Sequence, residues 1–314
     1  MLEPRLLARL EEKKAALDAL RPLPQAAVRR LQEQLTVEWI YNSNAIEGNT
    51  LTLRETKLIL ETGLTIGGKS LREHFEVLNH KEAIDYVESL AKGQAPVTSF
   101  EVRQIHKLIL SNIDDEEAGQ YRRVQVSIAG ADHRPPEAWQ VPQLMADWGE
   151  WLSGPVQDLH PIARAALAHR RLVVVHPFVD GNGRTARLAM NLLLMRDGYP
   201  PTIIENVQRR QYYRVLARAD VGDKEPLVNY VGRAAERSLT LYLEACTPRT
   251  EPPAPEDEWI PLREAAQDAP YSQDYLSLLA RKGRLEAIKR GRNWYTTRRA
   301  VAAYRASVSG ETQD

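Results

Sequence analysis

Residues 176–187 read His-Pro-Phe-Val-Asp-Gly-Asn-Gly-Arg-Thr-Ala-Arg, which places a base, a carboxylate, a glycine-rich turn and two guanidinium groups within twelve residues. The flanking stretches 163–175 and 188–195 consist mostly of Ala, Leu, Val and Met. Such apolar runs favour helices. We therefore expect a loop over 177–183 between two apolar helices, with the second helix beginning near Arg184.

The glycines of this loop suit anion binding. Gly181 and Gly183 can adopt backbone angles closed to other residues, which lets successive amides converge on one anion. The start of the following helix adds unpaired N–H groups and the positive end of its dipole. Arg184 and Arg187 are three positions apart, hence on one helix face, where each can direct two donors at phosphate oxygens.

Two further side chains of the stretch predict chemistry. Asp180 is a candidate ligand for a magnesium ion, which prefers one or two carboxylates together with substrate phosphates. His176 can take a proton from an attacking hydroxyl group at neutral pH. The stretch as a whole predicts transfer of a phosphate-containing group from a nucleotide.

Residues 176–187 resemble the signature of the Fic family, His-x-Phe-x-Asp/Glu-Gly-Asn-Gly-Arg-x-x-Arg, at every specified position. The resemblance implies a mainly α-helical core with a β-hairpin flap, which transfers AMP from ATP to a hydroxyl group of a target protein. By position it makes His176 the general base and Asp180 the Mg²⁺ ligand. It assigns the α-phosphate to Asn182 with the amides around Gly181 and Gly183, and the β- and γ-phosphates to Arg184 and Arg187.

The region before the core, residues 1–98, is expected to be helical. A helix from about 25 should stop at Glu47-Gly48-Asn49. Its end, Ser43-Asn-Ala-Ile-Glu47-Gly48-Asn49, resembles the inhibitory motif Ser/Thr-x-x-x-Glu-Gly/Asn of Fic proteins. Glu47 paired with Arg187 would occupy the guanidinium that the γ-phosphate needs. The motif therefore predicts self-inhibition through Ser43, Glu47 and Gly48.

Further helices are predicted by their capping residues and periodicity. Thr52 followed by Glu55 predicts a capping box, and apolar spacing predicts helices over 70–92 and 99–112, the second capped by Ser99. His106 falls in the second of these helices, and we expect it in the core or at the surface without a catalytic role.

The catalytic core is expected over residues 99–246, with a hairpin at 119–136. Apolar residues alternate with Gln and Ser from Val124 to Ile128, the period of a strand. By resemblance this hairpin is the Fic flap, which pairs with the backbone of the target protein. The flap residues that we expect to dock the target are Val124, Gln125, Val126, Ser127 and Ile128.

After the signature helix, residues 209–216 resemble the segment that walls the adenine in this family. Tyr212 and Tyr213 are the candidates for contact with the base. Asp220 stands where family members often carry an Asn for the ribose.

A small unit is expected at the carboxyl end. The proline-rich stretch 247–256 predicts a linker, and 257–308 resembles the winged helix-turn-helix of excisionase and MerR-type regulators, followed by a tail at 309–314. We expect helices over 261–269 and 272–282, a hairpin turning at Gly291, and a final helix capped by Thr297. The candidate DNA-binding residues are the basic side chains Arg281, Lys282, Arg284, Lys289, Arg290 and Arg292. Protein contacts are the alternative role, and DNA binding is favoured.

Composition narrows the remaining possibilities. The formal net charge of the 314 residues is zero, so no overall field points to nucleic acid or to a membrane surface. A single cysteine excludes an intramolecular disulfide, and no apolar run approaches the ~20 residues that span a bilayer. We expect a soluble, cytoplasmic protein. Homodimers are common in the family, and the sequence leaves the oligomeric state open.

The sequence thus predicts a self-inhibited protein adenylyltransferase that uses ATP and Mg²⁺, joined to a DNA-binding module. Two alternatives remain open. One is removal of AMP from a modified target, with Glu47 positioning water. The other is a non-enzymatic transcription regulator that senses ATP.

Overall fold

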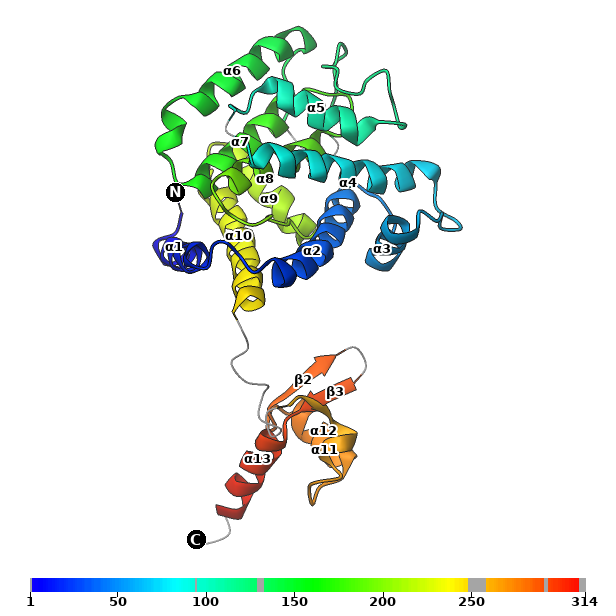
Figure 1. The fold of residues 1–314 in the computed structure, drawn as a ribbon, viewed down its shortest axis with the longest axis vertical. Coiled ribbons are helices and arrows are strands. Elements are labelled where there is room, and N and C mark those ends of the chain that lie inside the picture. Colours follow the sequence, from blue (N-terminus) through cyan, green and yellow to red (C-terminus); the bar gives the residue numbers. More distant parts are fainter. Residues whose placement is uncertain (1, 94, 129–132, 248–257, 291–292, 311–314) are drawn as a thin grey trace. The chain divides into compact units, whose positions relative to one another are not determined.

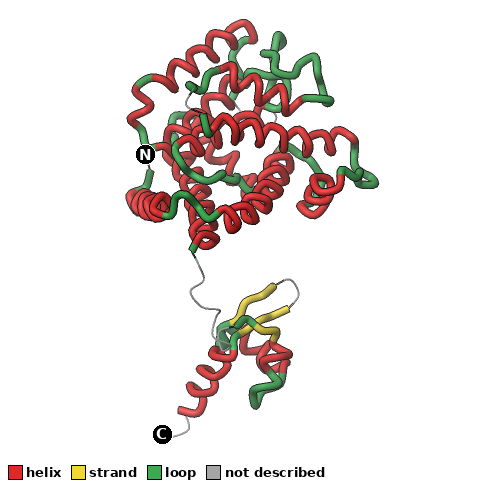
Figure 2. The backbone as a smooth tube through the Cα atoms, in the orientation of Figure 1, coloured by secondary structure: helices red, strands yellow, loops and turns green. Residues whose placement is uncertain are grey.

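The chain is mainly helical and divides into two compact units, Met1–Thr247 and Pro248–Asp314 (Figures 1 and 2). The computed structural model describes residues 2–93, 95–128, 133–247, 258–290 and 293–310. Across these ranges no helix combines the length and apolar character needed to cross a bilayer.

The first unit is built around a central helix, α8 (Asn182–Arg196). Every residue from Arg184 to Leu194 in α8 is buried, as expected of a helix surrounded by others. Its neighbours are α7 (Pro161–Val175), α4 (Leu71–Ala91) and α5 (Ser99–Leu110). The remaining helices of this unit are α1 (Pro4–Ala19), α2 (Gln25–Ile46), α3 (Leu53–Thr62), α6 (Val141–Ser153), α9 (Arg209–Asp220) and α10 (Glu225–Cys246), with 3-10 turns at Ala138–Gln140, Pro155–Asp158 and Asn206–Gln208.

Capping residues set where the helices of this unit begin and end. Thr52 and Glu55 form the predicted capping box at the start of α3. The helix α5 begins at Ser99, but its cap is Thr98, whose hydroxyl accepts from the backbone of Phe100. The prediction that Ser99 caps this helix was therefore wrong by one residue. α2 ends at Ile46, directly before the predicted stop, and Gly48 then takes a φ of 103°.

The predicted flap hairpin is the main error in the fold. The described parts of 119–136 contain no strand, and 129–132 lie outside the described residues. Pro135 and Pro136 have no N–H to donate, so the returning arm cannot complete a ladder. Side chains join the two arms instead: Gln125 Nε2 donates to Pro135 O at 3.0 Å, and Arg122 donates to the carbonyls of Val124 and Pro136.

The second unit combines short helices with a small sheet. Strands β1 (Ile260–Pro261), β3 (Asn293–Thr296) and β2 (Ala287–Arg290) pair antiparallel in that spatial order. The sequence predicted the β2–β3 hairpin but not β1, and Gly291 and Arg292 at its turn lie outside the described residues. The helices are α11 (Leu262–Ala265), α12 (Gln273–Arg281) and α13 (Arg298–Gly310).

The start positions of the last two helices match their predicted caps. Ser272 accepts from the backbone of Tyr275, and Thr297 accepts from that of Ala300. α11 is much shorter than the predicted helix over 261–269. The unit buries its own apolar core, which is formed by Ile260, Leu262, Ala265, Leu276, Leu279, Ala280, Leu285, Ala300 and Val301.

Candidate active site

The loop between α7 and α8 is held in shape by its own side chains. His176 ends α7 in the left-handed region, with a φ of 48°. The Asn182 side chain spans the loop, because its Oδ1 accepts from Phe178 N at 3.0 Å and its Nδ2 donates to Phe178 O at 2.9 Å. Asn182 therefore stabilises the conformation of this loop, which contains the backbone amides at Gly181 and Gly183.

His106 supports the same loop from α5. Its ring stacks on that of Phe178, with centroids 3.6 Å apart and planes inclined by 3°. Gly119 N donates to His106 Nδ1 at 2.9 Å, so Nε2 carries the proton and donates to Asp180 O at 2.9 Å. Burial lowers the pKa of His106 to about 4, which keeps this tautomer neutral. No sequence pattern indicates this role, because the hydrogen bond to Asp180 joins residues 74 positions apart.

His176 is poised to accept a proton. Its Nδ1–H donates to the carbonyl of Val173 at 3.3 Å, so the neutral ring presents the lone pair of Nε2. Burial is the main cause that lowers the pKa of His176 below 6.5, and the charge of Arg122 adds to the effect. The ring is therefore neutral at pH 7 and has the character of a general base.

Arg187 is buried and contacts residues at the end of α2. Its Nη1 lies 2.7 Å from Glu47 Oε1, and its side chain is 3% exposed against 32% for Glu47. It also donates to the hydroxyl of Ser43 at 3.1 Å and to the Ser43 carbonyl at 2.8 Å. Burial alone would lower the pKa of Arg187, but Glu47 and Tyr212 raise it.

Gly183 is what allows Glu47 to approach the loop. A Cβ atom at this position would overlap the Glu47 carboxylate and lie 3.1 Å from Arg187 Nη1. The carboxylate therefore sits directly over the backbone of the predicted phosphate cradle. Gly181 is equally constrained, since its φ is 72° and a Cβ there would lie 3.3 Å from the ring of His106.

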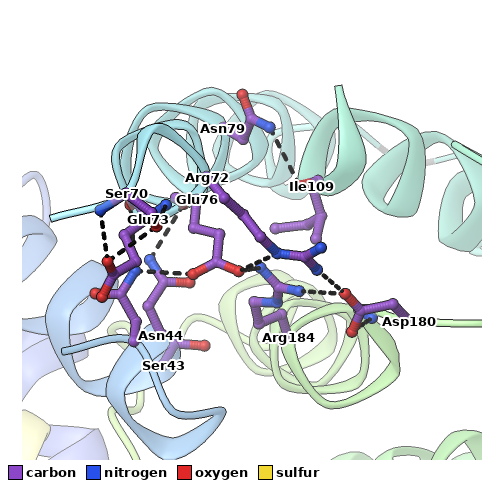
Figure 3. A network of polar contacts seen from close by, with 12 residues as sticks. Ser43, Asn44, Ser70, Arg72, Glu73, Glu76, Asn79, Ile109, Asp180 and Arg184 are labelled. Atoms are coloured by element: carbon purple, nitrogen blue, oxygen red, sulfur yellow. Dashed lines mark hydrogen bonds and ion pairs between the residues drawn. The ribbon is translucent and has the colours of Figure 1, made fainter. Parts of the chain in front are cut away.

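The other phosphate candidate, Arg184, is paired with a carboxylate that the sequence analysis missed. Arg184 Nη1 lies 3.3 Å from Oε1 of Glu76 on α4, and Nη2 lies 3.5 Å from Oδ2 of Asp180. Asp180 also pairs with Arg72 of α4, at 2.5 Å (Figure 3). Burial raises the pKa of Asp180, yet Arg184, the Gly181 amide and Arg72 together bring it below 3.8.

The sequence and the fold of this chain are similar to those of known proteins. Residues 96–194 match the Fic/DOC family. A Fic-domain signalling protein from Bacteroides thetaiotaomicron is 31% identical, with a TM-score of 0.72, and the match covers 76% of this chain and 96% of that one. The chain belongs to the Fic family.

Two further relatives show how far the match extends. A protein adenylyltransferase Fic from Drosophila grimshawi is 42% identical over 245 residues, and the chain spans about half the length of this and similar curated relatives, with 78% of the chain and 50% of the relative matched. A Fic family protein from Desulfovibrio desulfuricans is 26% identical with a TM-score of 0.66. Because that match covers 95% of this chain and 97% of the other, it takes in the second unit as well.

The two tyrosines expected at the adenine have different surroundings in this Fic chain. Tyr212 is buried, and its hydroxyl lies 2.9 Å from His169 Nε2. Tyr213 is 38% exposed beneath the guanidinium of Arg209, 4.8 Å from the ring centroid. Tyr213 is thus the more accessible of the two rings. Asp220, the ribose candidate, lies 3.6 Å from Arg170 at the end of α9.

Arg122 connects the predicted flap, residues 119–136, to the loop between α7 and α8. Its Nε donates to His176 O at 2.8 Å, which ties the flap to the candidate base. Val124 is 57% exposed, Gln125 and Ser127 are exposed, and Val126 and Ile128 are partly buried. The flap therefore presents its exposed side chains without a regular strand.

The basic residues of the second unit cluster along consecutive elements. Arg281 ends α12, and Lys282 and Arg284 follow it as exposed residues around Gly283, which has a φ of 66°. Lys289 and Arg290 lie on β2.

Proposed function

We propose that this chain is a self-inhibited protein adenylyltransferase that moves AMP from ATP to a Tyr, Ser or Thr hydroxyl of a target protein. The observation that carries the proposal is the neutral His176, with its Nε2 lone pair available. It stands at the start of the stretch 176–187, which holds two glycines and two arginines in the loop and the first turns of α8. Membership of the Fic family and the 42% identity to proteins named protein adenylyltransferase support the same reaction.

In this reaction the target hydroxyl transfers its proton to His176 Nε2 while its oxygen attacks the α-phosphorus of ATP. The bond from that phosphorus to the bridging oxygen breaks, so AMP becomes esterified to the target and pyrophosphate leaves. The amides around Gly181 and Gly183 and the guanidinium groups of Arg184 and Arg187 stabilise the negative charge of the phosphates. His106 and Asn182 act indirectly, as positioning residues of the loop.

Asp180 suits a magnesium ion by the chemistry of its own carboxylate, which Arg72 and Arg184 contact in this structure. Its side chain is 49% exposed, and among the described residues no group of three or more His, Cys, Asp or Glu forms a metal cluster. One carboxylate completed by substrate phosphates is the set that Mg²⁺ prefers. When bound, the ion would neutralise phosphate charge and orient the leaving pyrophosphate.

We further propose that Glu47 restrains the enzyme. The pairing with Arg187 and the approach to Gly183 support this role, because the carboxylate takes the guanidinium and the space that the γ-phosphate would need. ATP then binds with its α-phosphate misaligned, and a misplaced reacting atom is enough to suppress transfer.

The second unit is proposed to bind DNA. Its support is the run of basic residues from Arg281 to Arg290, on an exposed turn and a strand. Phosphate contacts by such residues would be strongly salt-dependent.

The experiment that tests the enzyme proposal uses ATP labelled at the α-phosphate with magnesium and purified protein. We compare wild type, Glu47→Gly, and Glu47→Gly with His176→Ala, and count label retained on protein. Label in Glu47→Gly alone supports AMP transfer and its restraint together. Equal label in wild type and Glu47→Gly refutes the restraint. If no variant is labelled while Glu47→Gly loses the ability to remove AMP from a modified target, the reverse reaction replaces the proposal.

A further inference from the structure

Two charged groups that the proposed reaction needs are already paired with side chains of α4. Asp180, the candidate metal ligand, pairs with Arg72, and Arg184, a candidate phosphate ligand, pairs with Glu76. Arg72 and Glu76 are one helical turn apart and contact each other at 3.4 Å. Figure 3 shows both side chains directed from α4 toward Asp180 and Arg184.

The two pairs differ in how readily they exchange partners. The side chains of Arg72 and Asp180 are 54% and 49% exposed, whereas those of Arg184 and Glu76 are 3% and 13% exposed. Exposed ion pairs contribute little and are easily replaced, while a buried charge that loses its partner is strongly disfavoured. Glu76 is also fixed by Asn49, whose Nδ2 donates to its Oε2 at 2.8 Å. Arg72 is therefore the partner that exchanges.

Arg72 takes an oxygen that a metal ion would need. It contacts Oδ2 of Asp180, while Oδ1 accepts from the Gly181 amide at 2.6 Å. A guanidinium and a divalent cation repel each other, so Arg72 in contact with Oδ2 disfavours a metal ion on the same oxygen.

We propose that Arg72 is a resident counter-cation of Asp180 that competes with Mg²⁺ and thereby weakens binding of the metal–nucleotide complex. The inference rests on the proposed function, because it takes Asp180 as the metal ligand. Arg72 does not weaken binding of metal-free ATP, since its positive charge attracts the phosphates. Arg72 therefore reduces the factor by which Mg²⁺ increases the affinity for ATP.

The test measures ATP affinity by titration calorimetry, once with Mg²⁺ and once with EDTA. The parent protein carries Glu47→Gly and His176→Ala, so that Arg187 is available and AMP transfer is blocked. The readout is the ratio of the Kd without metal to the Kd with metal. Adding Arg72→Gln should raise this ratio about two- to fivefold, the effect of losing one exposed ion pair.

Two variants serve as controls. Lys81→Gln makes the same charge change on α4, where Lys81 pairs with Asp85, and should leave the ratio unchanged. Arg72→Lys keeps the positive charge and should stay near the parent value. An unchanged or lower ratio in Arg72→Gln, or an equal rise in Lys81→Gln, overturns the inference.

Failure of the proposed function would look different. Absence of ATP binding in every variant, with or without Mg²⁺, refutes nucleotide binding itself. A parent ratio of one refutes Asp180 as a metal ligand and the competition with it.

Discussion

Replacing Glu47 by glycine should make the nucleotide-free protein less stable. Arg187 is 3% exposed and its Nη1 lies 2.7 Å from Glu47, so the substitution leaves a buried guanidinium without its counter-ion. Breaking a fully buried pair costs about 3–5 kcal/mol. Because Glu47 is 32% exposed and Ser43 still accepts two hydrogen bonds from Arg187, we expect a loss of about 2 kcal/mol in the free energy of unfolding.

The same substitution should make ATP a stronger stabiliser. A loss of about 2 kcal/mol lowers Tm by roughly 4–8 °C for a unit of this size. A ligand at about 100 times its Kd adds about 2.7 kcal/mol, so ATP at that concentration should offset the whole loss. In the wild type ATP must compete with Glu47 for Arg187, and its stabilising effect should be smaller.

Differential scanning calorimetry with and without Mg²⁺ and ATP measures both effects. Glu33→Gln is the control, because Glu33 lies on the same helix in an exposed pair with Arg29 and should change neither value. Glu47→Gln removes the charge but keeps the side-chain length, and should behave like Glu47→Gly. Equal Tm values and equal ATP shifts in wild type and Glu47→Gly would refute the argument that Glu47 and phosphate compete for one buried guanidinium.

Three other outcomes are expected. In Glu47→Gly protein the initial rate of AMP transfer should rise with pH as His176 loses its proton, and then stay level up to pH 8. The pKa of His176 lies below 6.5, so the rise should occur below that pH. A rate that falls over this range would exclude His176 as the base. The pKa values of His106 and His169 are lowered to about 4 and about 3, so the unfolded state binds more protons below pH 6.5 and urea midpoints should fall as pH drops from 6.5 to 4. In the Glu47→Gly background, His106→Leu should reduce the rate of AMP transfer by roughly tenfold or more, with little change in the Kd for ATP. The reason is that the loop loses the two hydrogen bonds of His106. An unchanged rate would show that the loop does not need these bonds.

The DNA proposal also has a direct outcome: Arg281→Glu with Arg284→Glu should weaken binding of duplex DNA in a mobility-shift assay and flatten its salt dependence by about one unit for each lost phosphate contact, while Arg54→Glu in the first unit should not.

The part of the candidate site that lies in one continuous stretch of sequence could be predicted. His176, Asp180, the glycines and both arginines belong to one loop and the start of α8, so short-range rules on helix ends and glycine conformations locate them together. The Glu47–Arg187 contact was expected only through a resemblance, and the structure contains that ion pair. Its inhibitory role stays a prediction.

The residues that the sequence did not predict act across long separations. His106, Arg72 and Glu76 lie on helices whose register against α8 depends on packing of the whole core, which no local pattern specifies. The prediction of a hairpin in the flap was wrong for another reason. The alternation over Val124–Ile128 was real, but a hairpin needs donors on both arms, and Pro135 and Pro136 remove them.

The described side chains give the proposed restraint a physical origin. A fold that buries two guanidinium groups near one loop must supply anions for them, because an unpaired buried charge is strongly disfavoured. Nucleotide phosphates can be those anions only while nucleotide is bound. In its absence Glu47 and Glu76 fill the role, one from the end of α2 and one from α4. On the proposed function, the contact that stabilises the empty site is therefore also the one that ATP must break, and restraint follows from the burial that makes the arginines effective phosphate ligands.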